Sequence, residues 1–324
     1  MRLLLQAAAI VAAAAMLWLG GSRMHDKQLP EETVVLQTWV STTVQTEPET
    51  TAARVITDVI DATGLDAEHI FLYDTQNQQM IFCNTDQTDT LYPASITKLF
   101  SAWVALQILS EDAVVTAGWE LGFLQPGSST AFIALDSRLT VEMLIEGMLL
   151  PSGNDAALVL AAAVGRHLLN EKKATASQAV ARFVEEMNRA AKALDLQNSH
   201  FENPDGYHAQ QHYSCPEDLA KIAWLALDEP VIRRCMELQK DKVTFVSGET
   251  LVWENTNRLL NPESDYYCPE AVGMKTGYTS MAGYCLMAAF GENPLVVGIF
   301  GAKEPLSRYE NAAALYDAWL QISE

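Results

Sequence analysis

The stretch Tyr92-Pro93-Ala94-Ser95-Ile96-Thr97-Lys98 decides how the rest of this chain is interpreted. A serine and a lysine three residues apart lie on the same side of a helix, one turn from each other. Serine is a weak nucleophile, and a neighbouring amine that accepts its proton activates it. Lysine is such an amine when burial or nearby cations lower its pKa. Alone, the pattern is a weak signal and is more typical of a neutral surface turn, so its meaning depends on the motifs that follow.

Composition limits the classes of protein to consider. The chain has 324 residues, 49% of them hydrophobic, which is enough for one large domain or two smaller ones with a sizeable core. Its formal net charge is -20. Nucleic-acid binding requires basic patches, so this charge argues against a nucleic-acid partner and favours a soluble, self-repelling surface.

The first 22 residues resemble an export segment. Arg2 precedes an uncharged, alanine-rich run from Leu3 to Gly21, which is either a cleaved signal peptide or an uncleaved membrane anchor. Residues 23–52 are polar and acidic and are interpreted as a linker. The body of the protein is then expected at residues 53–324, outside the cytoplasm.

The periodicity of apolar residues predicts an α+β fold. Strands are expected where short apolar runs flank polar turns, and helices where apolar residues recur at helical spacing. Strands are predicted at 69–73, 80–82, 282–290 and 295–300. Helices are predicted at 52–63, 95–109, 140–150, 155–169, 175–194, 216–227 and 307–322. The strands lie near both ends of the chain, so we expect one mostly antiparallel sheet built from both ends, with a helical lobe inserted between them.

A second motif, Ser152-Gly153-Asn154, follows Pro151 and opens the predicted alanine-rich helix. A serine hydroxyl relays protons, and an asparagine amide binds a carbonyl group or a lysine. The alternative is a helix N-cap, since Ser, Asn and the following Asp155 are favoured capping residues.

A third motif, Lys275-Thr276-Gly277, is predicted just ahead of the last pair of strands. It combines a positive charge, a hydroxyl and a glycine that lets another backbone approach closely, which suits the docking of an extended peptide that carries a carboxylate. The alternative is a charged loop before a strand.

The three motifs occur once each, in the order found in penicillin-binding proteins and class A β-lactamases. Over residues 53–322 the chain resembles the D-alanyl-D-alanine carboxypeptidases, which are low-molecular-mass penicillin-binding proteins with a serine β-lactamase-like fold. Asn203-Pro204-Asp205-Gly206, the segment from Gly273 to Thr279 and Arg308-Tyr309 also match the family's pattern. Ile96 and Cys215 depart from it, at positions without a reacting group. The C-terminal β-rich domain of many relatives is not expected here.

The resemblance implies a complete acyl-transfer site. Ser95 would be the nucleophile, Lys98 its base, and Ser152 the group that returns a proton to the leaving amine. The remaining residues would bind the substrate: Asn154, Lys275, Thr276, Gly277, Tyr278 and Arg308. The implied substrate is a peptidoglycan stem peptide ending in D-Ala-D-Ala, the implied inhibitors are β-lactams, and neither a cofactor nor a metal is implied.

Two alternatives remain open at this point. A class A β-lactamase shares the motifs but needs a glutamate in an E-x-x-L-N loop. The near matches Arg166-His167-Leu168-Leu169-Asn170 and Asn257-Arg258-Leu259-Leu260-Asn261 lack it. A non-catalytic peptidoglycan-binding relative is the other alternative, against which the intact motifs argue.

Two further features are interpreted as structural. His208 and His212 have the spacing of a zinc-protease motif, but the glutamate beside the first histidine is absent and the region reads as a loop. The five cysteines are widely spaced, without a C-x-x-C pair, and are either buried thiols or the source of one or two disulfides.

Overall fold

The computed structural model describes residues 51–65, 67–292 and 294–323, and the predicted export segment and most of the predicted linker lie outside them. The described residues form one compact unit. Within the described part of the chain, no helix is both long enough and apolar enough to cross a bilayer.

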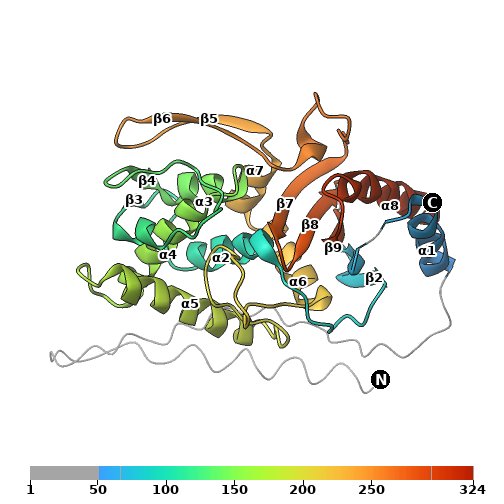
Figure 1. The fold of residues 1–324 in the computed structure, drawn as a ribbon, viewed down its shortest axis with the longest axis horizontal. Coiled ribbons are helices and arrows are strands. Elements are labelled where there is room, and N and C mark those ends of the chain that lie inside the picture. Colours follow the sequence, from blue (N-terminus) through green and yellow to red (C-terminus); the bar gives the residue numbers. More distant parts are fainter. Residues whose placement is uncertain (1–50, 66, 293, 324) are drawn as a thin grey trace, which may run out of the picture. The chain divides into compact units, whose positions relative to one another are not determined.

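A five-stranded antiparallel sheet forms the centre of the fold (Figure 1). Its strands follow the order β2-β1-β9-β8-β7. Their bounds are His69–Asp74 for β1, Gln79–Cys83 for β2, Ala271–Thr279 for β7, Gly283–Phe290 for β8 and Leu295–Ala302 for β9. β1 from the first part of the chain pairs directly with β9 from the last part. The predicted sheet built from both chain ends is therefore confirmed.

The two faces of the sheet belong to two different cores because strand side chains alternate between faces. Phe71, Met287 and Val296 point into the larger core, whereas Leu72, Leu286 and Val297 point into the smaller one. The smaller core is covered by two helices, α1 (Thr51–Thr63) and α8 (Ser307–Ser323), which lie together beside the sheet in Figure 1.

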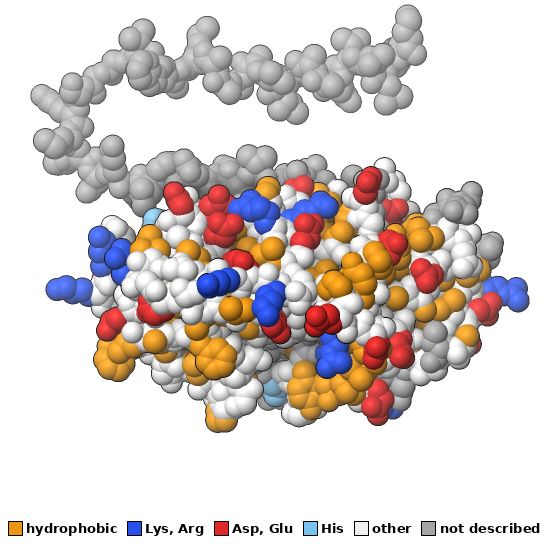
Figure 2. Space-filling model, turned by 90° about the horizontal axis from the view of Figure 1, so that it is seen from above, with side chains coloured by type: hydrophobic (Ala, Val, Ile, Leu, Met, Phe, Trp, Pro, Cys, Tyr) orange, Lys and Arg blue, Asp and Glu red, His pale blue; other side chains and the backbone are white. Residues whose placement is uncertain are grey.

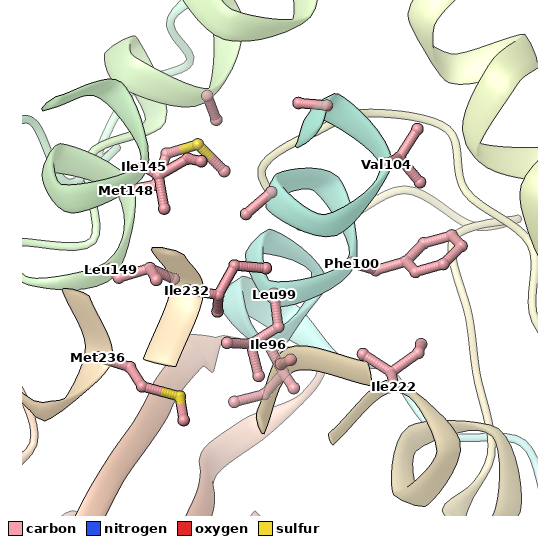
Figure 3. Packing of buried hydrophobic residues seen from close by; sticks show 14 of the residues in the cluster. Ile96, Leu99, Phe100, Val104, Ile145, Met148, Leu149, Ile222, Ile232 and Met236 are labelled. Atoms are coloured by element: carbon pink, nitrogen blue, oxygen red, sulfur yellow. The ribbon is translucent and has the colours of Figure 1, made fainter. Parts of the chain in front are cut away.

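The larger core fills the space between the sheet and the helical lobe. The lobe consists of α2 (Thr97–Leu106), α3 (Val141–Leu149), α4 (Asn154–Leu168), α5 (Ala176–Ala193), α6 (Pro216–Asp228) and α7 (Pro230–Glu237). Helix α2 lies at its centre, and Figure 3 shows Leu99 of this helix among Ile145 and Ile232 from the neighbouring helices. Eight of the ten residues of α2 are buried, which holds the start of this helix in one place relative to the sheet.

Several short elements were not predicted from the sequence. Two small hairpins pair β3 (Val114–Thr116) with β4 (Arg138–Thr140), and β5 (Lys240–Thr244) with β6 (Thr250–Glu254). Three 3₁₀ helices are also present: η1 (Ala94–Ile96), η2 (Trp119–Phe123) and η3 (Arg258–Leu260). Elements of three residues are too short to show a period, and β5 consists mainly of polar residues. These elements therefore have no hydrophobic signal in the sequence.

Two predicted positions are corrected. The helix expected at 95–109 begins as η1 and ends at Leu106, because Gln107 to Leu109 bond back in a turn instead of continuing the helix. Lys275-Thr276-Gly277 lies inside β7 rather than in front of a strand. All five cysteines are free, and Cys215, Cys235 and Cys285 are buried, which agrees with the thiol interpretation.

The surface is charged but mixed in sign. On the face shown in Figure 2, lysine and arginine side chains are interspersed with aspartate and glutamate side chains. Surface ion pairs such as Arg234 with Glu142, at 2.7 Å, belong to this mixed surface. Exposed pairs of this kind contribute at most about 1 kcal/mol each, so the two cores dominate the stability of the fold.

Replacement of Gly165 by alanine should destabilise the lobe. A Cβ atom at this position in α4 would overlap the backbone carbonyl of Ala179 in α5. Alanine raises helix propensity by about 1 kcal/mol, but overpacking against backbone costs about 1–3 kcal/mol or more. We expect a net loss in the free energy of unfolding, measured by urea denaturation. Gly122→Ala, where no atom lies within 4 Å of the added Cβ, is the control. Equal effects of the two substitutions would contradict the close packing of α4 on α5.

Candidate active site

Ser95 and Lys98 meet as their spacing predicts. Ser95 lies in η1, and Lys98 lies in the first turn of α2. The Nζ atom of Lys98 is 2.7 Å from the Oγ atom of Ser95. Ala94 has a left-handed backbone with φ of +47°, which turns the chain sharply just before the nucleophile. Such a conformation is strained for a residue with a Cβ and is found where the surroundings impose it.

Lys98 is fully buried and has three oxygen partners. Its Nζ atom lies 2.8 Å from Asn154 Oδ1 and 2.8 Å from the carbonyl oxygen of Asp205, in addition to Ser95 Oγ. Burial lowers the pKa of Lys98 to about 8, although the carboxylates of Asp205 and Asp155 act in the opposite direction. The neutral amine is therefore accessible near neutral pH.

The three partners match a neutral amine acting as a base. A neutral amine has two N–H donors and one lone pair. Asn154 Oδ1 and the Asp205 carbonyl are acceptors only, so they take the two donors. In this neutral form the lone pair faces Ser95 Oγ and can accept its proton, whereas in the protonated form Lys98 Nζ donates to Ser95 Oγ. This arrangement allows Lys98 to take the proton of Ser95 as the hydroxyl attacks.

The loop Asn203-Pro204-Asp205-Gly206 supplies the third partner of Lys98. Asn203 Oδ1 accepts from Gly206 N–H at 2.8 Å, and Asp205 Oδ1 accepts from Tyr207 N–H at 3.0 Å, so this segment is a turn as expected. Gly206 has φ of +78°, and a Cβ atom there would overlap the carbonyl oxygen of Ala94. The turn is thus pressed against the residue before the nucleophile. The sequence contains no signal that this turn supplies a carbonyl acceptor to Lys98.

The second motif forms a tight turn before α4. Ser152 is buried and has φ of +63°. Gly153 is the N-cap residue of α4 and makes no side-chain cap, so the capping interpretation of Ser152 and Asn154 is wrong. Asn154 instead reaches Lys98 with its Oδ1 atom, and its Nδ2 atom donates to Ser128 Oγ at 3.1 Å.

The third motif lies on β7, an edge strand of the sheet. Lys275 is fully buried, and burial together with the charges of Lys98 and Arg308 lowers its pKa well below the usual range. The proximity of the two lysines therefore acts on Lys275, whereas the lowered pKa of Lys98 has burial as its cause. The pairing partner of β7 on one side is β8, and its other side is the outer edge of the sheet.

Gly277 brings this edge strand against the nucleophile. A Cβ atom at Gly277 would lie 3.0 Å from Ala94 Cβ and 3.1 Å from the backbone nitrogen of Ser95. Any larger residue would force β7 away from η1. The next residue, Tyr278, has a side chain that is 57% exposed and stacks on Tyr284 with a centroid distance of 4.5 Å.

Thr276 and Arg308 are joined through a hydrogen-bonded chain. Thr276 Oγ1 lies 2.7 Å from Thr256 Oγ1, and the Thr256 carbonyl accepts from the hydroxyl of Tyr309 at 3.1 Å. Arg308 donates to Tyr309 Oη at 3.2 Å and to the carbonyl of Gly277 at 3.1 Å. The guanidinium of Arg308, in the first turn of the last helix, is thereby held against the backbone of β7 at Gly277.

Comparison with known proteins agrees with this geometry. The sequence model of the D-alanyl-D-alanine carboxypeptidases, peptidase family S11, matches residues 56–303. The chain belongs to this family. It is 29% identical over 245 residues to the D-alanyl-D-alanine carboxypeptidase DacF of Bacillus subtilis, covering 73% of this chain and 58% of that protein.

The match to a second relative covers a larger share of that relative's length. The chain is 33% identical over 232 residues to a D-alanyl-D-alanine carboxypeptidase of Streptomyces sp. (strain K15), covering 68% of this chain and 75% of that protein. The crystal structure of the Streptomyces K15 DD-transpeptidase has a TM-score of 0.69 and 28% identity to this chain, over 78% of this chain and 97% of that one. The predicted β-lactamase-like fold of the DD-peptidases is therefore confirmed.

His212 has a structural role in this family member. It is buried, its Nε2 atom lies 2.9 Å from Thr97 Oγ1, and its Nδ1 atom accepts from Glu202 N–H at 3.2 Å. Burial lowers its pKa to about 3, so the ring is neutral and ties the 203–213 loop to the first turn of α2. In the described ranges, no cluster of three or more His, Cys, Asp or Glu side chains is arranged to hold a metal ion.

The near matches to the E-x-x-L-N loop have other contacts. Arg166 lies in the last turn of α4 and forms an ion pair with the buried Glu120 at 2.8 Å. Asn257 caps η3 by accepting from Leu259 N–H, and its Nδ2 atom donates to the carbonyl of Gly273 at 3.1 Å. Neither segment brings a carboxylate to Ser95 at the position that the β-lactamase motif would require.

Acylation of Ser95 should depend on pH through Lys98. Its pKa of about 8 predicts that the rate falls about tenfold for each unit of pH below this value and is constant above it. The sign follows because only the neutral amine accepts the serine proton. The measurement is the initial rate of acylation by p-nitrophenyl acetate between pH 5.5 and 9.5, with Ser95→Ala as the background. A rate that is independent of pH between 6 and 8 would contradict the role of Lys98 as base.

Proposed function

We propose that this chain is a serine D-alanyl-D-alanine carboxypeptidase that removes the terminal D-alanine from peptidoglycan stem peptides. The observation that carries the proposal is the buried Lys98 amine, 2.7 Å from Ser95 Oγ, beside the free edge of β7. Family membership supports the reaction class. The chain spans 58% of the length of the Bacillus subtilis relative, so the activity of that whole protein is not transferred without a test.

The first half of the proposed reaction transfers the acyl group. Ser95 Oγ bonds to the carbonyl carbon between the two terminal D-alanines, and its proton passes to Lys98 Nζ. The N–H groups of Ser95 and Tyr278 bind the resulting oxyanion, and each such donor contributes about 2.7–4 kcal/mol to catalysis. The C–N bond then breaks as the proton on Lys98 Nζ passes through the hydroxyl of Ser152 to the departing amine, so that free D-alanine leaves and Lys98 is neutral again.

The second half restores the enzyme. Water bonds to the carbonyl carbon of the ester on Ser95 and loses a proton to Lys98, and the C–O bond to Ser95 breaks as Lys98 returns this proton to Ser95 Oγ. Asn154 orients both the peptide and Lys98, to which it is already bound at 2.8 Å. Thr276 supplies a hydroxyl and Arg308 a positive charge that bind the terminal carboxylate, Lys275 lies beside Thr276 on β7, and Gly277 keeps the strand edge close to Ser95. Thus only a peptide with a free C-terminus is well bound.

The location of the substrate sets the location of the enzyme. Peptidoglycan lies outside the cytoplasmic membrane. The proposal therefore places the catalytic domain, residues 53–324, in the cell wall or at the outer face of the cytoplasmic membrane. Residues 1–22 would direct export and either be cleaved or remain as an anchor, and residues 23–52 would link this segment to the domain. Comparison of the N-terminal sequence of the mature protein with that of the gene product tests this part separately.

Removal of the nucleophile should abolish release of D-alanine. Ser95→Ala is expected to lower kcat on diacetyl-L-lysyl-D-alanyl-D-alanine by at least about 10³-fold, because the acyl-enzyme cannot form. The measurement is an enzymatic D-alanine assay. Ser110→Ala makes the same substitution at an exposed serine in the loop after α2, whose hydroxyl donates to Asp112, and it serves as the control. Release at the parent rate by Ser95→Ala would contradict the proposed chemistry, and no release by the parent would favour a non-catalytic relative.

Benzylpenicillin should form a long-lived ester with Ser95. The carboxylates that act on Lys98 are those of Asp155 and Asp205, and both accept backbone N–H groups, from Ala131 and Tyr207 respectively. Both carboxylates are buried, and the glutamate of the E-x-x-L-N motif is absent from both near matches. Intact-mass measurement should show one adduct that persists over many times the acylation time, with Ser95→Ala unlabelled. Rapid turnover of penicillin would instead favour a β-lactamase.

A further inference from the structure

Phe132 is an aromatic residue that the fold exposes and strains. Its side chain is 77% exposed, and its backbone has φ of +60° in the left-handed region. A bulky residue in this region is a clear outlier, which costs about 1–3 kcal/mol. Asparagine or glycine would occupy the position with less strain, and exposure of the ring adds nothing to the core. Neither local conformation nor packing therefore explains a phenylalanine here.

The residues on both sides of Phe132 hold its backbone rigidly. The buried carboxylate of Asp155 accepts from Ala131 N–H at 2.8 Å and from Ile133 N–H at 3.0 Å. The indole Nε1 of Trp253 donates to the carbonyl of Ala131 at 3.0 Å. Ala131 and Ile133 are themselves buried. With both neighbours fixed inward, the side chain of Phe132 is forced out of the protein in one position.

This rigid segment, residues 128–133, adjoins the second catalytic motif, and we call it the strap. Asn154 N–H donates to the Ser129 carbonyl at 2.9 Å, and Asn154 Nδ2 donates to Ser128 Oγ. A Cβ atom at Gly153 would lie 2.7 Å from Ala131 Cβ. The strap therefore touches the turn between Ser152 and Asn154, and Phe132 follows the residue in that contact.

A second exposed aromatic residue, Tyr278, lies on β7 beside the site. Tyr278 extends from β7 next to Gly277, which touches the backbone of Ser95. In the proposed reaction the leaving D-alanine faces Thr276 and Arg308. The remaining part of the peptide must leave the site between the edge of β7 and the strap, because Lys98 and the 203–207 turn close its floor.

We infer that Phe132 is a specificity-determining residue that contacts the stem-peptide residue preceding the two D-alanines. This inference rests on the proposed function and names a contact within it. Where the third residue of the stem peptide is lysine or another diamino acid, its side chain has an aliphatic part. An exposed aromatic ring binds this part by burial of apolar surface. Binding of this residue relieves the exposure of Phe132 that the free protein maintains.

The test compares a long and a short substrate. In Phe132→Asn, kcat/KM for diacetyl-L-lysyl-D-alanyl-D-alanine should fall by about tenfold, whereas kcat/KM for acetyl-D-alanyl-D-alanine, which lacks the third residue, should not change. Phe132→Tyr keeps the ring and should retain the parent ratio. Asparagine tolerates the left-handed conformation, so the Tm of Phe132→Asn should equal or exceed that of the parent, and loss of folding is not the cause of the change.

Trp119→Asn provides the matched control. Trp119 is 79% exposed, and its neighbour Glu120 pairs with Arg166 in the last turn of α4, roughly 18 Å along that helix from Asn154. Its removal should leave the ratio for the two substrates unchanged. An active parent whose Phe132→Asn variant keeps the parent ratio, or loses both activities equally, would overturn the inference alone. A parent that releases D-alanine from neither peptide would overturn the proposed function and this inference with it.

Discussion

The amine of Lys98 is the interaction on which the rest of the site depends. Its three oxygen partners come from η1, from the start of α4 and from the turn at 203–206, which are far apart in the sequence. A buried amine without partners costs several kcal/mol, so the three segments must converge for the protein to fold. The same burial lowers the pKa of Lys98 to about 8 and makes it a base. Folding and catalysis therefore use one set of contacts.

Backbone strain is concentrated around this amine. Ala94, Ser152 and Phe132 are all left-handed without being glycine, and each lies next to a segment that contacts Lys98, Ser95 or Asn154. Such conformations persist only where surrounding contacts impose them. Here the contacts are the close approach of Gly206 to Ala94, the anchoring of α4, and the carboxylate of Asp155 under the strap. The helical lobe and the sheet together supply the rigidity that holds the reacting groups.

The position of β7 at the edge of the sheet explains how a peptide reaches the buried pair. The two lysines have no exposed surface, yet Gly277 places the free edge of β7 directly against Ser95. An edge strand offers unpaired backbone groups to an extended ligand. The site thus combines a buried floor, which lowers the pKa values of the two lysines, with an open side lined by Tyr278 and Phe132.

The sequence by itself determined the three motifs, the helices and strands of strong periodicity, and the antiparallel sheet drawn from both chain ends. These features depend on local spacing and alternation, which a single chain displays. Only the tertiary structure decided that the Asp205 carbonyl holds Lys98, that Asp155 supports the strap instead of capping a helix, and that Lys275 lies inside an edge strand. Backbone carbonyls are common to all residues, and the partner of a buried carboxylate is set by packing between distant segments, so neither leaves a pattern in the sequence.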